Sequence, residues 1–252
     1  MYTKAIDLRE FYDSTQGRVV QRLLRSHIRA FWPGVGGMRV LGLGYAVPYL
    51  KMFMGEAERV TALMPSHQGA VYWPPPEKGD ERGLVAMCDE AELPIETNSI
   101  DRLLVVHGLQ GYESLDVILK ESWRVLSGQG RIMLVVPNRT GIWARVDSTP
   151  FGHGTPYSLG QIRQVLKEYL FVPERDERAL FVPPSTSRLM LTTAPVWENI
   201  GYRFFNAIGG VNIVEATKQL YAGTMVGAAT SQAAVARRRM MPTASGRLHL
   251  PK

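Results

Sequence analysis

Residues 100–138 read IDRLLVVHGLQGYESLDVILKESWRVLSGQGRIMLVVPN, and this stretch decides the fold. The predicted strands 99–109 and 131–138 contain the continuous apolar runs LLVV and IMLVV, which are typical of strands buried on both faces of a parallel sheet. Between them, apolar residues recur at helical spacing over 114–126. The apolar face of this helix comprises Leu115, Ile118, Leu119, Trp123 and Leu126. The stretch therefore predicts a strand, an amphipathic helix and a second strand of an α/β protein.

The same alternation continues on both sides of this unit. Residues 1–32 carry a helical apolar stripe, and a helix-like stretch covers 48–55. Ser158 and Gln161 have the spacing of a capping box at a helix start, and residues 188–207 are expected to be helical. The other predicted strands are MRVLGLG (38–44), RVTALMP (59–65), GLVAMCD (83–89), RALFVPP (178–184) and GVNIVEATKQLY (210–221).

The domain organisation follows from composition and charge. We expect an N-terminal helical cap over 1–36, one α/β domain over 37–222, and a basic, flexible tail over 223–252. The net charge is +6, but five cations and no acid lie from Arg237 onward, so the rest of the chain is nearly neutral. A folded nucleic-acid-binding face is therefore not expected, although the tail could dock on a protein or an RNA.

Composition excludes several classes of protein. Hydrophobic residues make up 45% of the chain, and the single cysteine, Cys88, rules out an intrachain disulfide framework. The five histidines show no metal-ligand spacing, so no metal site is predicted. No apolar run suits a signal peptide or a membrane span. We expect a cytoplasmic protein.

The strongest local motif is VLGLGYAVPYL, residues 40–50. A strand that runs into Gly42-Leu43-Gly44 lets the backbone approach a ligand closely, because glycine has no Cβ. The same pattern also fits a plain strand–turn–helix junction or a nicotinamide-binding fold. The motif lacks a third glycine, since Ala46 stands there.

Taken with the segments 87–110 and 118–138, the sequence resembles the class I S-adenosylmethionine-dependent methyltransferases of the methyltransferase type 11 group. The resemblance covers about Arg39 to Asn138 and extends loosely to FYDSTQGR, residues 11–18. It implies a Rossmann-like, mostly parallel seven-stranded sheet with helices on both faces. It also implies S-adenosylmethionine as cofactor and S-adenosylhomocysteine as product. The matching positions are Asp89, Leu93-Pro94, Asp101, Arg124-Val125-Leu126, Gly128 and Gly130.

The resemblance implies roles for single residues. Gly42 and Gly44 would pass under the methionine end of the cofactor, and Tyr12 would cover it. Asp89 would accept a hydrogen bond from the adenine amino group, and His107 would sit by the transferable methyl. The full set of implied cofactor-binding residues is Tyr12, Gly42, Gly44, Tyr45, Met64, Asp89, Glu90 and His107.

One departure from the family pattern concerns the ribose. Met64 stands where the family has an acid that binds both ribose hydroxyls. The loss of a charge-assisted hydrogen bond costs about 1.5–3 kcal/mol, or roughly ten- to a hundredfold in affinity. Ser66 or His67 could replace it in part.

The segment 139–157 follows a strand end, where parallel sheets bind ligands. Its composition suits an ordered substrate loop or a structural crossover. The predicted substrate-binding residues are Asn138, Arg139, Trp143 and Arg145, and the candidate catalytic bases are His107, His153 and Tyr157.

Two functions follow. The first is S-adenosylmethionine-dependent methyl transfer to a small-molecule or protein acceptor. The second is a catalytically weak or inactive methyltransferase-like protein that binds a partner or forms a homodimer. The resemblance implies a glyoxalase II-type hydrolase as that partner.

Overall fold

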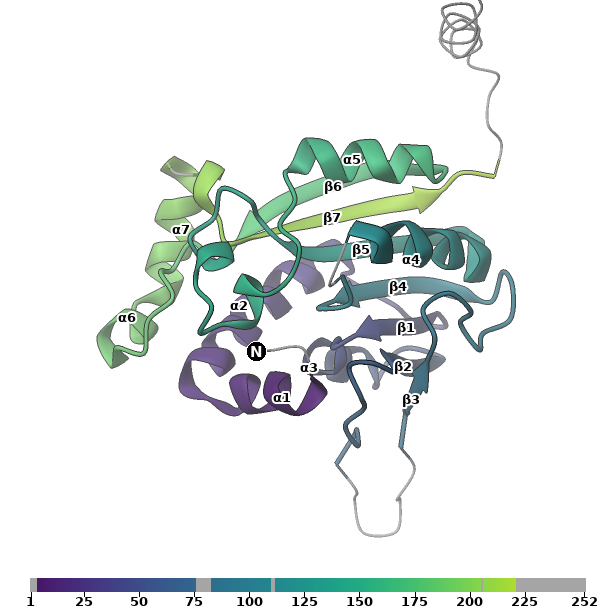
Figure 1. Cartoon of the computed structure of the whole chain (residues 1–252), viewed down its shortest axis with the longest axis horizontal. Helices are drawn as coiled ribbons and strands as arrows, with labels where there is room; N and C mark the ends of the chain where they lie inside the picture. The colour runs from purple at the N-terminus through teal and green to yellow at the C-terminus, as the bar shows by residue number, and fades with distance from the viewer. Residues whose placement is uncertain (1–3, 76–82, 110–111, 205, 221–252) are drawn as a thin grey trace, which may run out of the picture. The chain divides into compact units, whose positions relative to one another are not determined.

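A computed structural model describes residues 4–75, 83–109, 112–204 and 206–220. Seven strands form one sheet in the order β3-β2-β1-β4-β5-β7-β6 (Figure 1). Every neighbouring pair is parallel except β5–β7 and β7–β6, so β7 alone is reversed among these strands. The strands are β1 (Arg39–Gly44), β2 (Arg59–Pro65), β3 (Val85–Cys88), β4 (Ile100–Val106), β5 (Leu126–Pro137), β6 (Phe171–Ala179) and β7 (Val211–Lys218).

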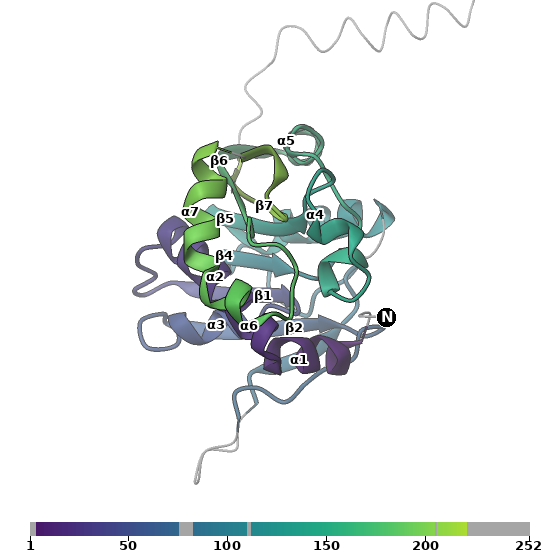
Figure 2. The same ribbon diagram turned by 90° about the vertical axis from the view of Figure 1, so that its left-hand side faces the viewer.

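Helices lie on both faces of the sheet, as expected (Figure 2). The α-helices are α1 (Ala5–Asp13), α2 (Thr15–Phe31), α3 (Val47–Leu50), α4 (Tyr112–Val125), α5 (Leu159–Glu168), α6 (Arg188–Thr192) and α7 (Ala194–Phe204). The 3₁₀ helices are η1 (Lys51–Phe53), η2 (Trp143–Arg145), η3 (Pro150–Gly152) and η4 (Asn206–Ile208). The expected mostly parallel α/β architecture is thus confirmed.

The sheet separates two hydrophobic cores. Successive residues of a strand point to opposite faces, so Leu104 packs with Ile28 of α2, whereas Leu103 packs with Ile118 of α4. The apolar spacing of 114–126 is what buries α4. The predicted capping box of α5 is also confirmed, because Ser158 Oγ accepts from the Gln161 N–H while Gln161 Oε1 accepts from the Ser158 N–H.

The predicted N-terminal helical segment is two helices. Ser14 leaves the helical conformation, and its hydroxyl accepts a hydrogen bond from Gly17 N at 3.0 Å, which caps α2. A Cβ on Gly17 would lie 1.9 Å from the Phe11 carbonyl oxygen. Glycine therefore allows α2 to start directly against the end of α1.

The prediction of a strand over 178–184 was wrong. The strand is β6, Phe171–Ala179, and it ends where Leu180 takes a φ of +62°. The Glu198 carboxylate of α7 accepts from the backbone N–H groups of Leu180 and Phe181, at 2.7 and 2.9 Å, and this draws the chain out of the sheet. In addition, β5 starts at Leu126, before the predicted start of this strand at residue 131.

Within the described ranges no helix is long and apolar enough to cross a membrane. Within the same ranges no cluster of three potential metal ligands occurs. The predicted tail, 223–252, lies outside the described residues.

Candidate functional site

The order of the strands reverses between β1 and β4, whose last residues, Gly44 and Val106, lie side by side. Open α/β sheets bind their ligands outside the carboxyl ends of the strands at such a switch point. The residues that follow the two strands are Tyr45 and His107. The candidate site is therefore the carboxyl edge of β1 and β4, together with the neighbouring ends of β2 and β3.

The two predicted glycines allow close packing of the chain at this edge. Gly44 has a φ of +77°, and a Cβ there would lie 2.4 Å from the Val106 carbonyl oxygen and 2.7 Å from Gly108 Cα. Gly42 lies inside β1, where a Cβ would lie 2.6 Å from Leu50 Cδ1. Gly44 thus allows β1 and β4 to converge, and Gly42 allows the helix after β1 to pack on the strand.

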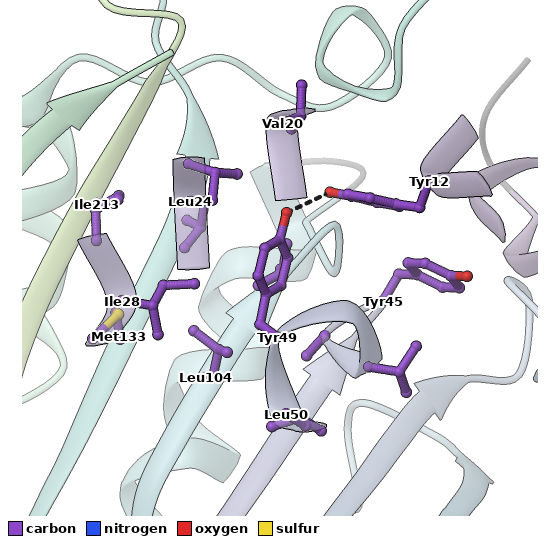
Figure 3. Close-up of a cluster of buried hydrophobic side chains, with 14 of the residues drawn as sticks. Tyr12, Val20, Leu24, Ile28, Tyr45, Tyr49, Leu50, Leu104, Met133 and Ile213 are labelled. Carbon is purple, nitrogen blue, oxygen red and sulfur yellow. Dashed lines mark hydrogen bonds between the residues drawn. The ribbon is translucent and has the colours of Figure 1, made fainter. Parts of the chain in front are cut away.

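An aromatic cluster, formed by Tyr12, Tyr45, Tyr49, His107 and Phe151, lies at the switch point. The Tyr12 hydroxyl is 2.8 Å from the Tyr49 hydroxyl and 2.8 Å from His107 Nε2. Figure 3 shows the first of these bonds and the Tyr12 and Tyr45 rings side by side; the centroids are 5.7 Å apart and the planes differ by 18°. The Phe151 ring of η3 lies 4.9 Å from the His107 ring. Helix α1 is thereby held over the ends of β1 and β4.

Burial controls the charge of this cluster. Desolvation lowers the pKa of His107 to about 3 and raises the pKa values of Tyr12 and Tyr49 above their ordinary value. All three groups are therefore neutral near pH 7. The two hydrogen bonds are consistent with one direction, in which the Tyr49 hydroxyl donates to the Tyr12 oxygen and the Tyr12 hydroxyl donates to His107 Nε2. In this arrangement His107 is a poor general base, because its accepting nitrogen is occupied and its pKa is low.

The ends of β2 and β3 carry the other predicted cofactor residues. Asp89 is exposed, and its Oδ1 accepts from Ala91 N at 2.9 Å. Glu90 Oε1 lies 3.3 Å from His67 Nδ1. Met64 is fully buried in the core on the α2 face, beside Met87 of β3 in the sheet. The Ser66 hydroxyl donates to the Cys88 carbonyl oxygen, so both residues that could replace the missing acid already have partners.

Gln68 also belongs to this edge, and no sequence motif points to it. The residue is 2% exposed, and its side-chain Nε2 donates to the His107 backbone carbonyl oxygen at 2.9 Å. Its backbone carbonyl oxygen accepts from Ala5 N at 2.7 Å. Its Oε1 is buried and has no hydrogen-bond partner among the described residues. Gln68 therefore links α1, the β2 end and the β4 end, and it leaves one acceptor unsatisfied at the site.

The fit of S-adenosylmethionine differs along this edge. At the end of β3, Asp89 offers an exposed carboxylate, which suits an adenine amino group. At the ends of β1 and β4, the side chains of Tyr12 and Tyr45 are buried against each other. The exposed carboxylate of Asp89 therefore suits the adenine, no free acid stands at the ribose position, and the rings of Tyr12 and Tyr45 cover the ends of β1 and β4, where the methionine end would lie.

The predicted substrate segment is built on two buried anchors. The Asn138 side-chain amide donates to the Gly209 carbonyl oxygen at 2.7 Å, and Trp143 Nε1 donates to the Val182 carbonyl oxygen at 2.8 Å. Both side chains are almost fully buried, so they fix the segment from inside. Arg139 and Arg145 are exposed. Of the four predicted substrate residues, the structure thus places two in the interior and two at the surface.

The three candidate bases do not come together. His107 lies in the aromatic cluster. His153 follows η3, and its Nε2 lies 2.7 Å from the Asp147 carbonyl oxygen. Tyr157 is buried in the core on the α4 and α5 face. Of these three, His107 is the residue that lies at the switch point.

Comparisons with known proteins agree with this geometry. No family model and no curated protein matches the sequence. Among solved structures, an S-adenosylmethionine-dependent methyltransferase from Thermotoga maritima is 14% identical, with a TM-score of 0.56 over 86% of this chain and 98% of that chain. A methyltransferase in complex with the Trm112 methyltransferase activator of Haloferax volcanii is 16% identical, with a TM-score of 0.56 over 85% and 98%.

The [4+2]-cyclase SpnF is also similar, at 20% identity and a TM-score of 0.52 over 80% of this chain and 81% of that chain. These likenesses show that the chain has the Rossmann-like fold of class I methyltransferases. Because a cyclase shares that fold, the reaction has to be argued from the site.

Proposed function

We propose that this protein binds S-adenosylmethionine at the carboxyl edge of β1, β3 and β4 and transfers its methyl group to a small-molecule or protein acceptor. The observation that carries the proposal is that Gly44, Asp89 and His107 all lie at the carboxyl ends of parallel strands, β1, β3 and β4, on the edge of the sheet where the strand order reverses. The cofactor would supply an activated methyl group, so the protein has mainly to position the acceptor.

The proposed roles are divided along the edge. Asp89 accepts a hydrogen bond from the adenine amino group, and Glu90 lies beside it. Tyr12 and Tyr45 face the methionine end, and they control entry because their rings stack over the ends of β1 and β4. Met64 supplies a buried thioether in place of an acid, so we expect an affinity roughly ten- to a hundredfold weaker than a ribose-binding carboxylate would give.

Titration calorimetry with S-adenosylhomocysteine and S-adenosylmethionine tests this function. We expect micromolar binding, and we expect Asp89→Ala to weaken it by at least about tenfold. Glu96→Ala is the matched control, because Glu96 is an exposed carboxylate that precedes β4 and lies at the opposite edge of the sheet. Equal effects of the two substitutions, or no binding at millimolar ligand, would refute the proposed site.

A second function, partner binding, is favoured by the surface of α6, α7 and η4. Monomeric proteins rarely expose large apolar side chains in such density, and surfaces of this kind commonly bind another protein. The exposed apolar side chains of this region are Leu189, Val196, Trp197, Ile200, Tyr202, Phe204 and Ile208. The partner would be a second copy of the chain or another protein, and a glyoxalase II-type hydrolase is the one that the resemblance implied.

Size-exclusion chromatography with light scattering, alone and with a purified glyoxalase II-type hydrolase, tests the second function. We expect a dimer or a stoichiometric complex that Leu189→Glu and Phe204→Glu dissociate, since these two side chains are 73% and 69% exposed. Met54→Glu, at an exposed methionine that follows η1 and is not part of this surface, is the control. A protein that stays monomeric and does not bind the hydrolase would argue against partner binding.

A further inference from the structure

A surface cavity of about 390 Å³ lies where α2, the start of α3, η1 and the segment after β2 meet. Its lining includes Arg25 of α2, Lys51 of η1, the Trp73 side chain, and the rings of Tyr12 and Tyr45. Asp89 and His107 are not among its lining residues. The cavity therefore adjoins the aromatic cluster and is separate from the adenosine end of the proposed cofactor site.

Two positive charges face this cavity without compensation. Neither the Arg25 guanidinium nor the Lys51 ammonium has a hydrogen bond or an ion pair with any residue in the described ranges. Nearby cations do have acidic partners: Arg29 pairs with Glu56, and Arg9 lies 3.7 Å from Asp13. Asp13 also lines the cavity, but Arg9 already partners its carboxylate. The net charge of the side chains that line the cavity is therefore positive.

The other walls suit a planar group. Trp73 is 8% exposed, and Tyr12 and Tyr45 are 6% and 3% exposed, so all three rings are held firmly by packing. Gln21 Nε2 donates to the Pro48 carbonyl oxygen at 2.7 Å, which fixes the wall between α2 and α3. Rings that are fixed in this way stack with planar ligands at little entropic cost, and the volume is in the range of small-molecule sites.

We infer that this cavity binds a small anion in which a phosphate or carboxylate group is attached to an aromatic ring. Arg25 and Lys51 hold the anionic group, and guanidinium suits both anions because its fork can donate two parallel hydrogen bonds. The Trp73 wall contacts the ring. The cavity shares Tyr12 and Tyr45 with the proposed methionine end of the cofactor site, but the inference goes beyond methyl transfer and does not depend on it, because Arg25 and Lys51 have no role in that reaction.

Titration calorimetry of the full chain with phenyl phosphate, benzoate, phenol and inorganic phosphate tests the inference. We expect phenyl phosphate or benzoate to bind at least about tenfold more tightly than phenol, because phenol lacks the charge. Whichever of the two anions binds more tightly identifies the natural anionic group as phosphate or carboxylate. Phenol that binds as tightly as both anions, or no binding by either anion, would overturn the inference.

Substitutions test whether these two cations form the site. Arg25→Met and Lys51→Met should each weaken binding of the better anion by at least about tenfold. Arg22→Met is the matched control, since Arg22 is an exposed arginine of the same helix that does not line the cavity, and its effect should stay within about twofold. Thermal unfolding followed by circular dichroism verifies that each variant is folded. Equal losses in Arg22→Met and Arg25→Met would show a non-specific charge effect and refute the site.

Discussion

Replacement of Tyr12 by phenylalanine removes the hydroxyl that joins α1 to both Tyr49 and His107, while the ring that stacks on Tyr45 stays. The Tyr49 side chain is fully buried and the His107 side chain is partly buried and neutral, so both partners lose a hydrogen bond that water cannot fully replace. A buried polar group without a partner costs about 1–3 kcal/mol. Two such groups give an expected loss of about 2–4 kcal/mol in the free energy of unfolding, after allowance for relaxation.

Urea titration followed by circular dichroism measures this loss, and the thermal midpoint should fall by at least about 4 °C. Tyr45→Phe is the matched control, because the Tyr45 hydroxyl has no hydrogen-bond partner in the described part of the chain. The control should change stability by less than about 0.5 kcal/mol. If the two variants unfold at the same urea concentration, the hydroxyl of Tyr12 does not hold α1 in place and the reasoning fails.

The same substitution separates a structural role from a gating role. Tyr12→Phe weakens the contacts that keep α1 over the ends of β1 and β4, so a larger fraction of molecules is open to ligand. Because the apparent Kd varies inversely with the open fraction, affinity for S-adenosylhomocysteine should rise while stability falls. A loss of both stability and affinity would contradict gating by Tyr12.

Three further outcomes are expected. The pKa of His107 is about 3 in the folded state and 6.5 in the unfolded state, so between these pH values the unfolded state binds more protons. The free energy of unfolding should therefore fall by about 1.4 kcal/mol for each pH unit as the pH drops through this window. Urea titrations at several pH values should show that the free energy of unfolding depends less on pH in His107→Asn. Asparagine is chosen because it tolerates the φ of +50° at this position. Gly44→Ala should cost more than about 2 kcal/mol in the same assay, because its Cβ meets the Val106 carbonyl oxygen, whereas Gly36→Ala, which meets no atom, should cost little. Glu198→Ala should lower the thermal midpoint, since two backbone N–H groups lose their acceptor at about 1–3 kcal/mol each; an unchanged midpoint would contradict this role.

The aromatic cluster shows where sequence reasoning reached its limit. The sequence placed Tyr12 and His107 at the same site through the family resemblance, and the structure brings them into contact across 95 positions of chain. It gave no sign of Tyr49, 37 positions from Tyr12, or of Gln68. These residues have no local pattern of their own, because their partners come from other elements.

The strand β6 illustrates a second limit. Its sequence, FVPERDERA, is rich in charge and was not predicted as a strand, whereas the more apolar run after it was. The strand lies at the edge of the sheet beside β7, where one side is not paired and charged side chains can reach water. Hydrophobic patterning therefore missed this charged edge strand, although it predicted β3, the apolar strand at the other edge of the sheet.

The sequence by itself determined the strand–helix–strand unit of β4, α4 and β5 and the start of α5 at Ser158. The reason is that the spacing of apolar residues and the capping of a helix both depend on residues that are close together in the chain. Only the tertiary structure decided that Tyr49 joins Tyr12 at the switch point and that Arg25 and Lys51 face one cavity with no partner among the described residues. Contacts of this kind depend on which elements pack together. The physical reason is that the pKa of a histidine or the pairing of a cation is set by neighbours in space, and those neighbours are distant in sequence.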